Sequence, residues 1–124
     1  MTVTVSTHQS EEDIRNEDIL IYLNGKILPK NEAVVSVYDS GFMLGDGVWE
    51  GLRLYNNKWA FCSEHIDRLF EAALAIDLDI GLSKSDVIDA LIKTQNSNGM
   101  VNNCLLYTSP SPRDYAASRM TSSA

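Results

Sequence analysis

The sequence predicts an α+β fold: a small antiparallel sheet with two helices packed on one of its faces. Short β-prone runs separated by turn residues fill the chain from residue 19 to residue 62. Two longer segments follow, in which apolar residues recur with helical spacing. Strands that precede helices, instead of alternating with them, favour an antiparallel sheet over a parallel one.

The first expected element is a hairpin. Residues 19–23 are apolar, and Asn24-Gly25 after them supplies the positive φ angles of a tight type I′ turn. Residues 26–29 should therefore return as a second strand. Residues 33–37 are expected to form another strand, because they are rich in valine.

A glycine-rich segment precedes the second hairpin. Residues 39–47 contain three glycines and are expected to be irregular. Residues 48–55 alternate in polarity as a strand does, Asn56-Asn57 should turn the chain, and residues 58–62 should return.

Two helices are expected after the strands. Ser63 is of a residue type that caps helices, and the first helix should bury one stripe: Ile66, Leu69, Phe70, Ala73 and Leu74. Ser83 with Asp86 resembles a capping box at the start of the second helix, which should end near Asn98-Gly99. The apolar face of that helix should consist of Val87, Ile88, Leu91 and Ile92.

The charge and the hydropathy of the chain argue against several classes of protein. The 124 residues carry 10 Lys and Arg against 17 Asp and Glu, a formal net charge of −7. This argues against a general nucleic-acid binder, which would present a basic face. No apolar run approaches the roughly 18 residues of a membrane span, and no signal peptide is recognisable at the start.

The chain divides into three parts. Residues 1–18 are polar and are expected to be a mobile N-terminal arm with a short strand at residues 3–5. Residues 19–103 should form the main domain, which is expected to be incomplete. Cys62 is its only cysteine, so the domain has no internal disulfide, which fits a reducing cytoplasm.

Residues 104–124 are expected to be a non-native tail. One reading frame of a common transposase-based sequencing adapter spells CLLYTSPSPRD, residues 104–114, and a later adapter segment nearly spells residues 118–124. The alternative is a natural Ser/Pro-rich tail of the kind that is often disordered. We expect the tail to be dispensable and unstructured. The next natural strand of the sheet should follow Asn103.

One face of the strand at residues 48–55 has the composition of a pocket wall. With a period of two, Trp49, Gly51, Arg53 and Tyr55 share this face. The aromatic ring would pack an apolar part of a substrate, glycine would leave room, and arginine would bind a carboxylate through paired hydrogen bonds. The alternative that this pattern leaves open is an ordinary sheet face with Arg53 in solvent.

The segment EHIDRL, residues 64–69, offers a second candidate in Arg68. A guanidinium fork matches phosphate oxygens. The alternative is a solvated helix arginine paired with Glu64 at i,i+4. We interpret His65 as a packing residue.

Other motifs carry less chemistry. The segment GFMLGDG lacks the Lys-Ser/Thr of a phosphate-binding P-loop. Asp39, Asp46 and Glu50 are not spaced as a metal site, so we expect caps, turns and solvated charges there and no metal.

Taken together, residues 38–69, YDSGFMLGDGVWEGLRLYNNKWAFCSEHIDRL, resemble the N-terminal domain of the class IV (fold type IV) aminotransferases. This group includes branched-chain and D-amino-acid aminotransferases, and the resemblance extends over roughly residues 20–103. It implies pyridoxal 5′-phosphate (PLP) as the cofactor, with its phosphate bound by Arg68. It also implies that Trp49, Gly51 and Arg53, within VWEGLR, line the substrate side.

Two departures from the family pattern affect the substrate contacts. Leu44 stands where branched-chain enzymes often place a site tyrosine, and Trp49 stands where the D-amino-acid enzymes have theirs. The G-x-R continuation after Glu50 is the branched-chain pattern, so a branched-chain-like amino acid is the favoured substrate.

The resemblance implies transfer of an amino group between an amino acid and a 2-oxo acid. The Schiff-base lysine of the family lies in a C-terminal domain that is missing here, so we expect no catalytic residue in this chain and no activity from it alone. Two alternatives remain: an aminodeoxychorismate lyase-like PLP enzyme, and a non-catalytic binding domain without cofactor. The full-length parent is expected to be a cytoplasmic homodimer that binds neither nucleic acid nor membrane.

Overall fold

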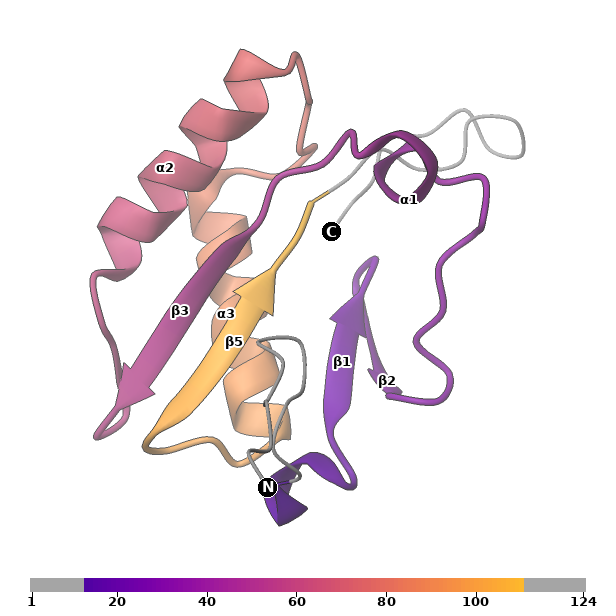
Figure 1. The fold of residues 1–124 in the computed structure, drawn as a ribbon. Coiled ribbons are helices and arrows are strands. Elements are labelled where there is room, and N and C mark those ends of the chain that lie inside the picture. Colours follow the sequence, from indigo (N-terminus) through magenta and orange to yellow (C-terminus); the bar gives the residue numbers. More distant parts are fainter. Residues whose placement is uncertain (1–12, 111–124) are drawn as a thin grey trace, which may run out of the picture.

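A computed structural model describes residues 13–110 and confirms the α+β fold class (Figure 1). The expected strand at residues 3–5 lies outside the described residues, as do residues 111–124 of the expected tail. The elements, in chain order, are the 3₁₀ helix η1 (Ile14–Asn16), β1 (Leu20–Leu23), β2 (Lys26–Pro29), α1 (Ser40–Leu44), β3 (Glu50–Tyr55), β4 (Lys58–Trp59), α2 (Cys62–Ala75), α3 (Lys84–Ser97) and β5 (Cys104–Thr108).

The described strands form two antiparallel sheets where one was expected. β1 pairs with β2, and a three-stranded sheet has the order β4-β3-β5, with β3 in the centre. The hairpin at Asn24-Gly25 is confirmed, since Leu23 pairs with Lys26 and both turn residues have positive φ, 51° and 85°. This is the backbone that a type I′ turn requires.

The expected strand at residues 33–37 is wrong. These residues form no regular element, and Val34, Val35 and Val37 are 72%, 60% and 65% exposed. Valine favours a strand mainly through packing against neighbouring strands. Within residues 13–110, no strand pairs with this segment.

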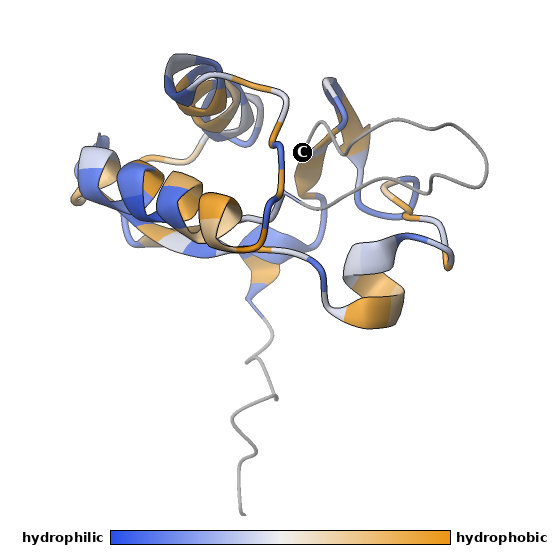
Figure 2. Cartoon of the chain, turned by 90° about the horizontal axis from the view of Figure 1, so that it is seen from above, coloured by the Kyte–Doolittle hydropathy of each residue, from blue (hydrophilic) through white to orange (hydrophobic). Residues whose placement is uncertain are grey.

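The glycine-rich segment is more regular than expected, because it contains α1. The Asp39 carboxylate caps this short helix by accepting a hydrogen bond from the Gly41 amide at 2.8 Å. Gly45 ends it in the left-handed conformation, with φ 73°. Figure 2 shows α1 standing apart from the two long helices and coloured in part as hydrophobic, and its Phe42, Met43 and Leu44 side chains are 69%, 58% and 71% exposed.

The two long helices lie on one side of the three-stranded sheet, as expected (Figure 1). The core joins the inner face of β3 to both of them: Val48, Leu52, Ile66, Leu69, Ala73, Ile80, Val87 and Leu91 form one buried cluster. Leu74 was wrongly assigned to the buried stripe and is 78% exposed. It lies about 100° farther round the helix than Ala73, which turns its side chain away from the sheet.

The helix starts were predicted with mixed success. The capping box is confirmed, because the Ser83 side chain accepts from the Asp86 amide and the Asp86 side chain accepts from the Ser83 amide. The cap at Ser63 is wrong: α2 begins at Cys62, and its N-cap is Phe61, two residues earlier, which has φ 52° and no side-chain cap. Ser63 instead donates to Glu64 within the first turn.

The expectation that residues 104–124 are unstructured is wrong for their first part. β5 pairs with β3 from Glu50–Thr108 to Leu54–Cys104, so the strand that follows Asn103 is formed by residues that were expected to belong to an unstructured tail. Its sequence alternates as a strand requires: Leu106 packs on the core, whereas Leu105 and Tyr107 are exposed. This alternation is enough for β5 to pair with the edge of the sheet, whether or not these residues belong to the natural protein.

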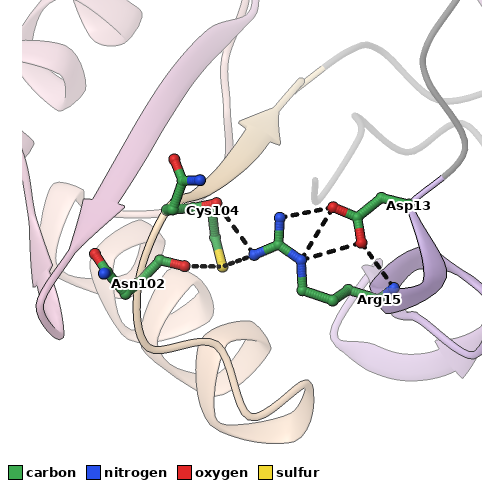
Figure 3. A network of polar contacts seen from close by, with 5 residues as sticks. Asp13, Arg15, Asn102 and Cys104 are labelled. Atoms are coloured by element: carbon green, nitrogen blue, oxygen red, sulfur yellow. Dashed lines mark hydrogen bonds and ion pairs between the residues drawn. The ribbon is translucent and has the colours of Figure 1, made fainter.

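Residues 13–18 contact the start of β5. Arg15 donates to both carboxylate oxygens of Asp13 and to the backbone oxygen of Asn103 at 3.3 Å, and its Nη1 lies 3.9 Å from the Cys104 sulfur (Figure 3). The hydrogen bonds from Arg15 lower the pKa of Asp13 to about 2. This part of the expected arm is therefore attached to the domain.

Candidate functional site

The strand β3 separates two chemically different faces. The predicted alternation is confirmed, since Glu50, Leu52 and Leu54 are buried toward the helices. On the outer face Trp49 is 67% exposed and Arg53 is exposed. The three residues predicted to bind substrate are therefore brought together on one face.

Tyr107 of β5 covers part of this outer face. It lies opposite Gly51 in the register, and a Cβ added at Gly51 would stand 3.2 Å from its ring. Its ring also meets Trp49 edge-on, with centroids 5.7 Å apart. The room left by Gly51 is thus occupied by an aromatic ring. The Arg53 side chain, in contrast, has no hydrogen bond or ion pair within residues 13–110, and only its backbone is bonded, accepting from the Ala60 amide at 2.9 Å.

The inner face of β3 carries a buried carboxylate. Glu50 is 6% exposed and accepts from Arg68 Nε at 2.5 Å, from Arg68 Nη2 at 2.8 Å and from His65 Nδ1 at 2.7 Å. A carboxylate only accepts hydrogen bonds, so Nδ1 is the protonated ring nitrogen of His65. The expectation that Glu50 is a solvated charge is wrong.

Glu50 and Arg68 stabilise each other in their charged forms. The hydrogen bonds from Arg68, and then those from His65, lower the pKa of Glu50, although burial opposes the shift. The same contact with Glu50 raises the pKa of Arg68. Glu50 is therefore ionised at neutral pH, and its negative charge is matched by an adjacent guanidinium.

The helix α2 places both partners of Glu50. His65 and Arg68 are three residues apart and so lie on the same side of the helix. The alternative pairing of Arg68 with Glu64 is not what forms, because Glu50 is the partner of Arg68. The Arg68 side chain is nevertheless 68% exposed. Two of its five N–H groups bond to Glu50, and the other three have no partner among residues 13–110 and could bind an anion.

The candidate residues fall on two sides of one strand. Trp49, Gly51 and Arg53 lie on the outer face, whereas Arg68 lies on the helix side. Glu50 links the two groups, since it sits between Trp49 and Gly51 in the chain and bonds to Arg68. Its role was missed in the sequence, although a lone acid on the apolar face of an alternating strand is a recognisable signal.

The cysteines of the described part of the chain do not pair with each other. Cys62 and Cys104 are both free, and burial raises the pKa of the Cys62 thiol. Between residues 13 and 110, no group of three or more His, Cys, Asp or Glu side chains is placed to hold a metal ion. No helix in the same range is long and apolar enough to cross a membrane.

No family model matches the chain, but individual proteins do. Over 80 residues it is 44% identical to a putative branched-chain-amino-acid aminotransferase of Methanocaldococcus jannaschii, which covers 64% of this chain and 28% of the relative. Over 81 residues it is 42% identical to a D-alanine aminotransferase of Listeria innocua, with 63% and 28% covered. The chain thus spans less than a third of the length of these curated relatives.

Solved structures show the same fold. The branched-chain aminotransferase of Thermoproteus uzoniensis, determined with norvaline, superposes with a TM-score of 0.71 at 24% identity, over 77% of this chain and 34% of that one. Another branched-chain aminotransferase, determined with pyridoxamine 5′-phosphate, has a TM-score of 0.73 at 24% identity, over 79% and 33%. The resemblance to class IV aminotransferases is therefore confirmed: over the matched residues the chain is homologous to branched-chain and D-alanine aminotransferases, and it has the fold of the branched-chain enzymes.

Proposed function

We propose that this chain is part of a PLP-dependent aminotransferase and contributes the residue that binds the cofactor's phosphate and one wall of the substrate pocket. The observation that carries the proposal is Arg68. Its guanidinium is exposed, held on one edge by Glu50, and keeps three N–H groups for an anion. The homology to aminotransferases supplies the identity of that anion.

The residues fit the cofactor's phosphate. An arginine fork matches phosphate oxygens in geometry and in charge, and charge-assisted hydrogen bonds of this kind are stronger than neutral ones. When bound, the cofactor supplies the electron sink for amino-group transfer. The contribution proposed for this chain is to bind the cofactor's phosphate and to orient the cofactor.

The outer face of β3 fits a substrate wall. Among residues 13–110 the guanidinium of the exposed Arg53 has no partner, so its N–H donors can bind a substrate carboxylate, and the exposed Trp49 ring offers apolar surface. We propose Trp49, Gly51 and Arg53 as substrate-binding residues, with a branched-chain-like amino acid and a 2-oxo acid as substrates. The catalytic lysine is proposed to lie in residues beyond those described here.

Two rival functions have less support. A lyase of the aminodeoxychorismate type shares the fold expected here, but the matched proteins are aminotransferases. A non-catalytic binding domain would not need a prepared anion site at Arg68. We further propose a cytoplasmic homodimer for the full-length protein; its free cysteines suit a reducing compartment, and size-exclusion chromatography would show the dimer.

The proposal is tested with two arginine variants of the full-length protein. Arg68→Ala should weaken PLP binding, whereas Arg53→Ala should raise KM for the amino acid and leave PLP affinity unchanged. Arg15→Ala, a surface arginine tied to Asp13, is the matched control and should change neither. PLP affinity is read from the cofactor's absorbance on titration. Equal PLP affinity in the Arg68→Ala and Arg15→Ala proteins would contradict the proposal.

A further inference from the structure

We infer that Glu50 is a positioning residue that holds the Arg68 guanidinium ready for the cofactor's phosphate. The inference rests on the proposed phosphate role of Arg68. It assigns a function to the buried carboxylate of Glu50, which neither binds the phosphate nor contacts the substrate in the proposed function.

Glu50 and Arg68 differ strongly in burial. Glu50 is 6% exposed and fixed in a strand, whereas the side chain of Arg68 is 68% exposed. A long exposed side chain loses rotamer freedom when it binds a ligand, and that loss weakens binding. Two hydrogen bonds to a buried carboxylate remove the freedom beforehand, which is how a supporting residue prepares a site.

The carboxylate of Glu50 binds only part of the Arg68 guanidinium. Glu50 Oε1 and Oε2 accept from Nε and Nη2, which form one edge of the guanidinium. Among the described residues, the second N–H of Nη2 and both N–H groups of Nη1 have no partner, and the former, with one N–H of Nη1, forms the adjoining edge. The carboxylate therefore occupies one edge and presents the adjoining one.

His65 holds the carboxylate itself. Its Nδ1–H donates to Glu50 Oε2 at 2.7 Å, so Oε2 receives hydrogen bonds from both His65 and Arg68. The carboxylate is thus fixed by two residues of α2 while its backbone belongs to β3. Because Glu50 lies between Trp49 and Gly51, the same contacts also set the distance between the helix and the proposed substrate wall.

Orientation and charge predict opposite effects when Glu50 is neutralised. Its negative charge beside Arg68 reduces the attraction of the guanidinium for phosphate, so removing the charge alone would tighten binding. Loss of the paired hydrogen bonds would weaken binding, because Arg68 would no longer be held. The sign of the change therefore distinguishes the two roles.

The experiment compares apo-protein affinities for PLP and for pyridoxal, which lacks the phosphate, in the full-length protein. Glu50→Gln keeps the side-chain shape and should weaken PLP binding about tenfold, the size of one charge-assisted hydrogen bond. Pyridoxal affinity should not change. In an Arg68→Ala background, Glu50→Gln should have no further effect. Glu64→Gln, an exposed acid on the same helix, is the matched control and should leave both affinities unchanged.

Each other outcome has a defined meaning. Unchanged or tighter PLP binding by the Glu50→Gln protein would overturn the inference. An equal loss of pyridoxal affinity, or a loss that persists in the Arg68→Ala background, would also overturn it by showing a merely structural role. If Arg68→Ala itself leaves PLP affinity unchanged, the proposed phosphate site fails, and the inference fails with it.

Discussion

Leu69→Ala and Leu74→Ala form a matched pair of substitutions on α2. Both remove the same atoms from the same helix, but Leu69 is 0% exposed and Leu74 is 78% exposed. Any difference between the two variants therefore reports burial. The pair tests whether α2 packs on β3 as described, which is the arrangement that brings Arg68 to Glu50.

The expected difference follows from the core. Leucine loses roughly three methylene equivalents, at about 0.8 kcal/mol each, and the cavity left at Leu69 adds to this, for a total of about 3 kcal/mol. Leu74→Ala should change the free energy of unfolding by no more than about 0.5 kcal/mol. Small domains have a total stability of about 5–15 kcal/mol, so Leu69→Ala should remove roughly a fifth to three fifths of it.

Urea unfolding of the 124-residue chain at low concentration measures the difference. Trp59 is a suitable fluorescence reporter, because it packs on the core and its indole N–H donates to Gln95 at 2.9 Å. With a urea dependence of about 1–3 kcal/mol per molar, Leu69→Ala should lower the midpoint by about 1–3 M. Equal midpoints for the two variants would refute the packing of α2, as would a larger shift for Leu74→Ala.

Four further predictions concern the site and the chain. In the full-length protein, Arg68→Ala should weaken PLP binding more than Arg68→Lys, because lysine keeps the charge but loses the fork. PLP titration measures both affinities, and an unchanged affinity in the Arg68→Ala protein, with the fold intact, would exclude Arg68 from the cofactor site. The folded pKa of Glu50 lies below its unfolded value, so its contribution to stability is present above about pH 4.3 and is lost as the pH falls toward the folded pKa. Glu50→Gln should accordingly make the acid side of the stability-pH profile shallower, and an unchanged profile would contradict this. When the source DNA is re-amplified and sequenced across codon 103, the codons that follow should differ from those of the present residues 104–124. Finding the same tail in an independent genomic clone would refute an adapter origin. The 124-residue chain should show no amino-acid-dependent transamination above a PLP-only control, because the catalytic lysine is expected elsewhere; turnover by the purified chain would contradict that expectation.

Local signals predicted those parts of the fold that depend on neighbouring residues. The Asn24-Gly25 turn and the Ser83–Asp86 capping box are determined by backbone chemistry within a few residues, and both are confirmed. The alternation of β3 was also readable, because a half-buried strand repeats every two residues.

Features that depend on distant partners were not predictable in the same way. Val34 and its neighbours have strand propensity but no strand pairs with them in the described chain, and Leu74 has helical spacing but lies beyond the contact with the sheet. Within the site, Arg68 and the outer face of β3 were identified through family motifs. The partner of Arg68 was not, since Glu50 is 18 residues away and the contact exists only after α2 packs on β3.

The most direct test of the account is a crystal structure of the full-length protein with PLP bound. We predict a guanidinium nitrogen of Arg68 within about 2.7–3.2 Å of a phosphate oxygen, with Glu50 still bonded to the adjoining edge through Nε. A phosphate bound elsewhere, with Arg68 directed into solvent, would contradict it.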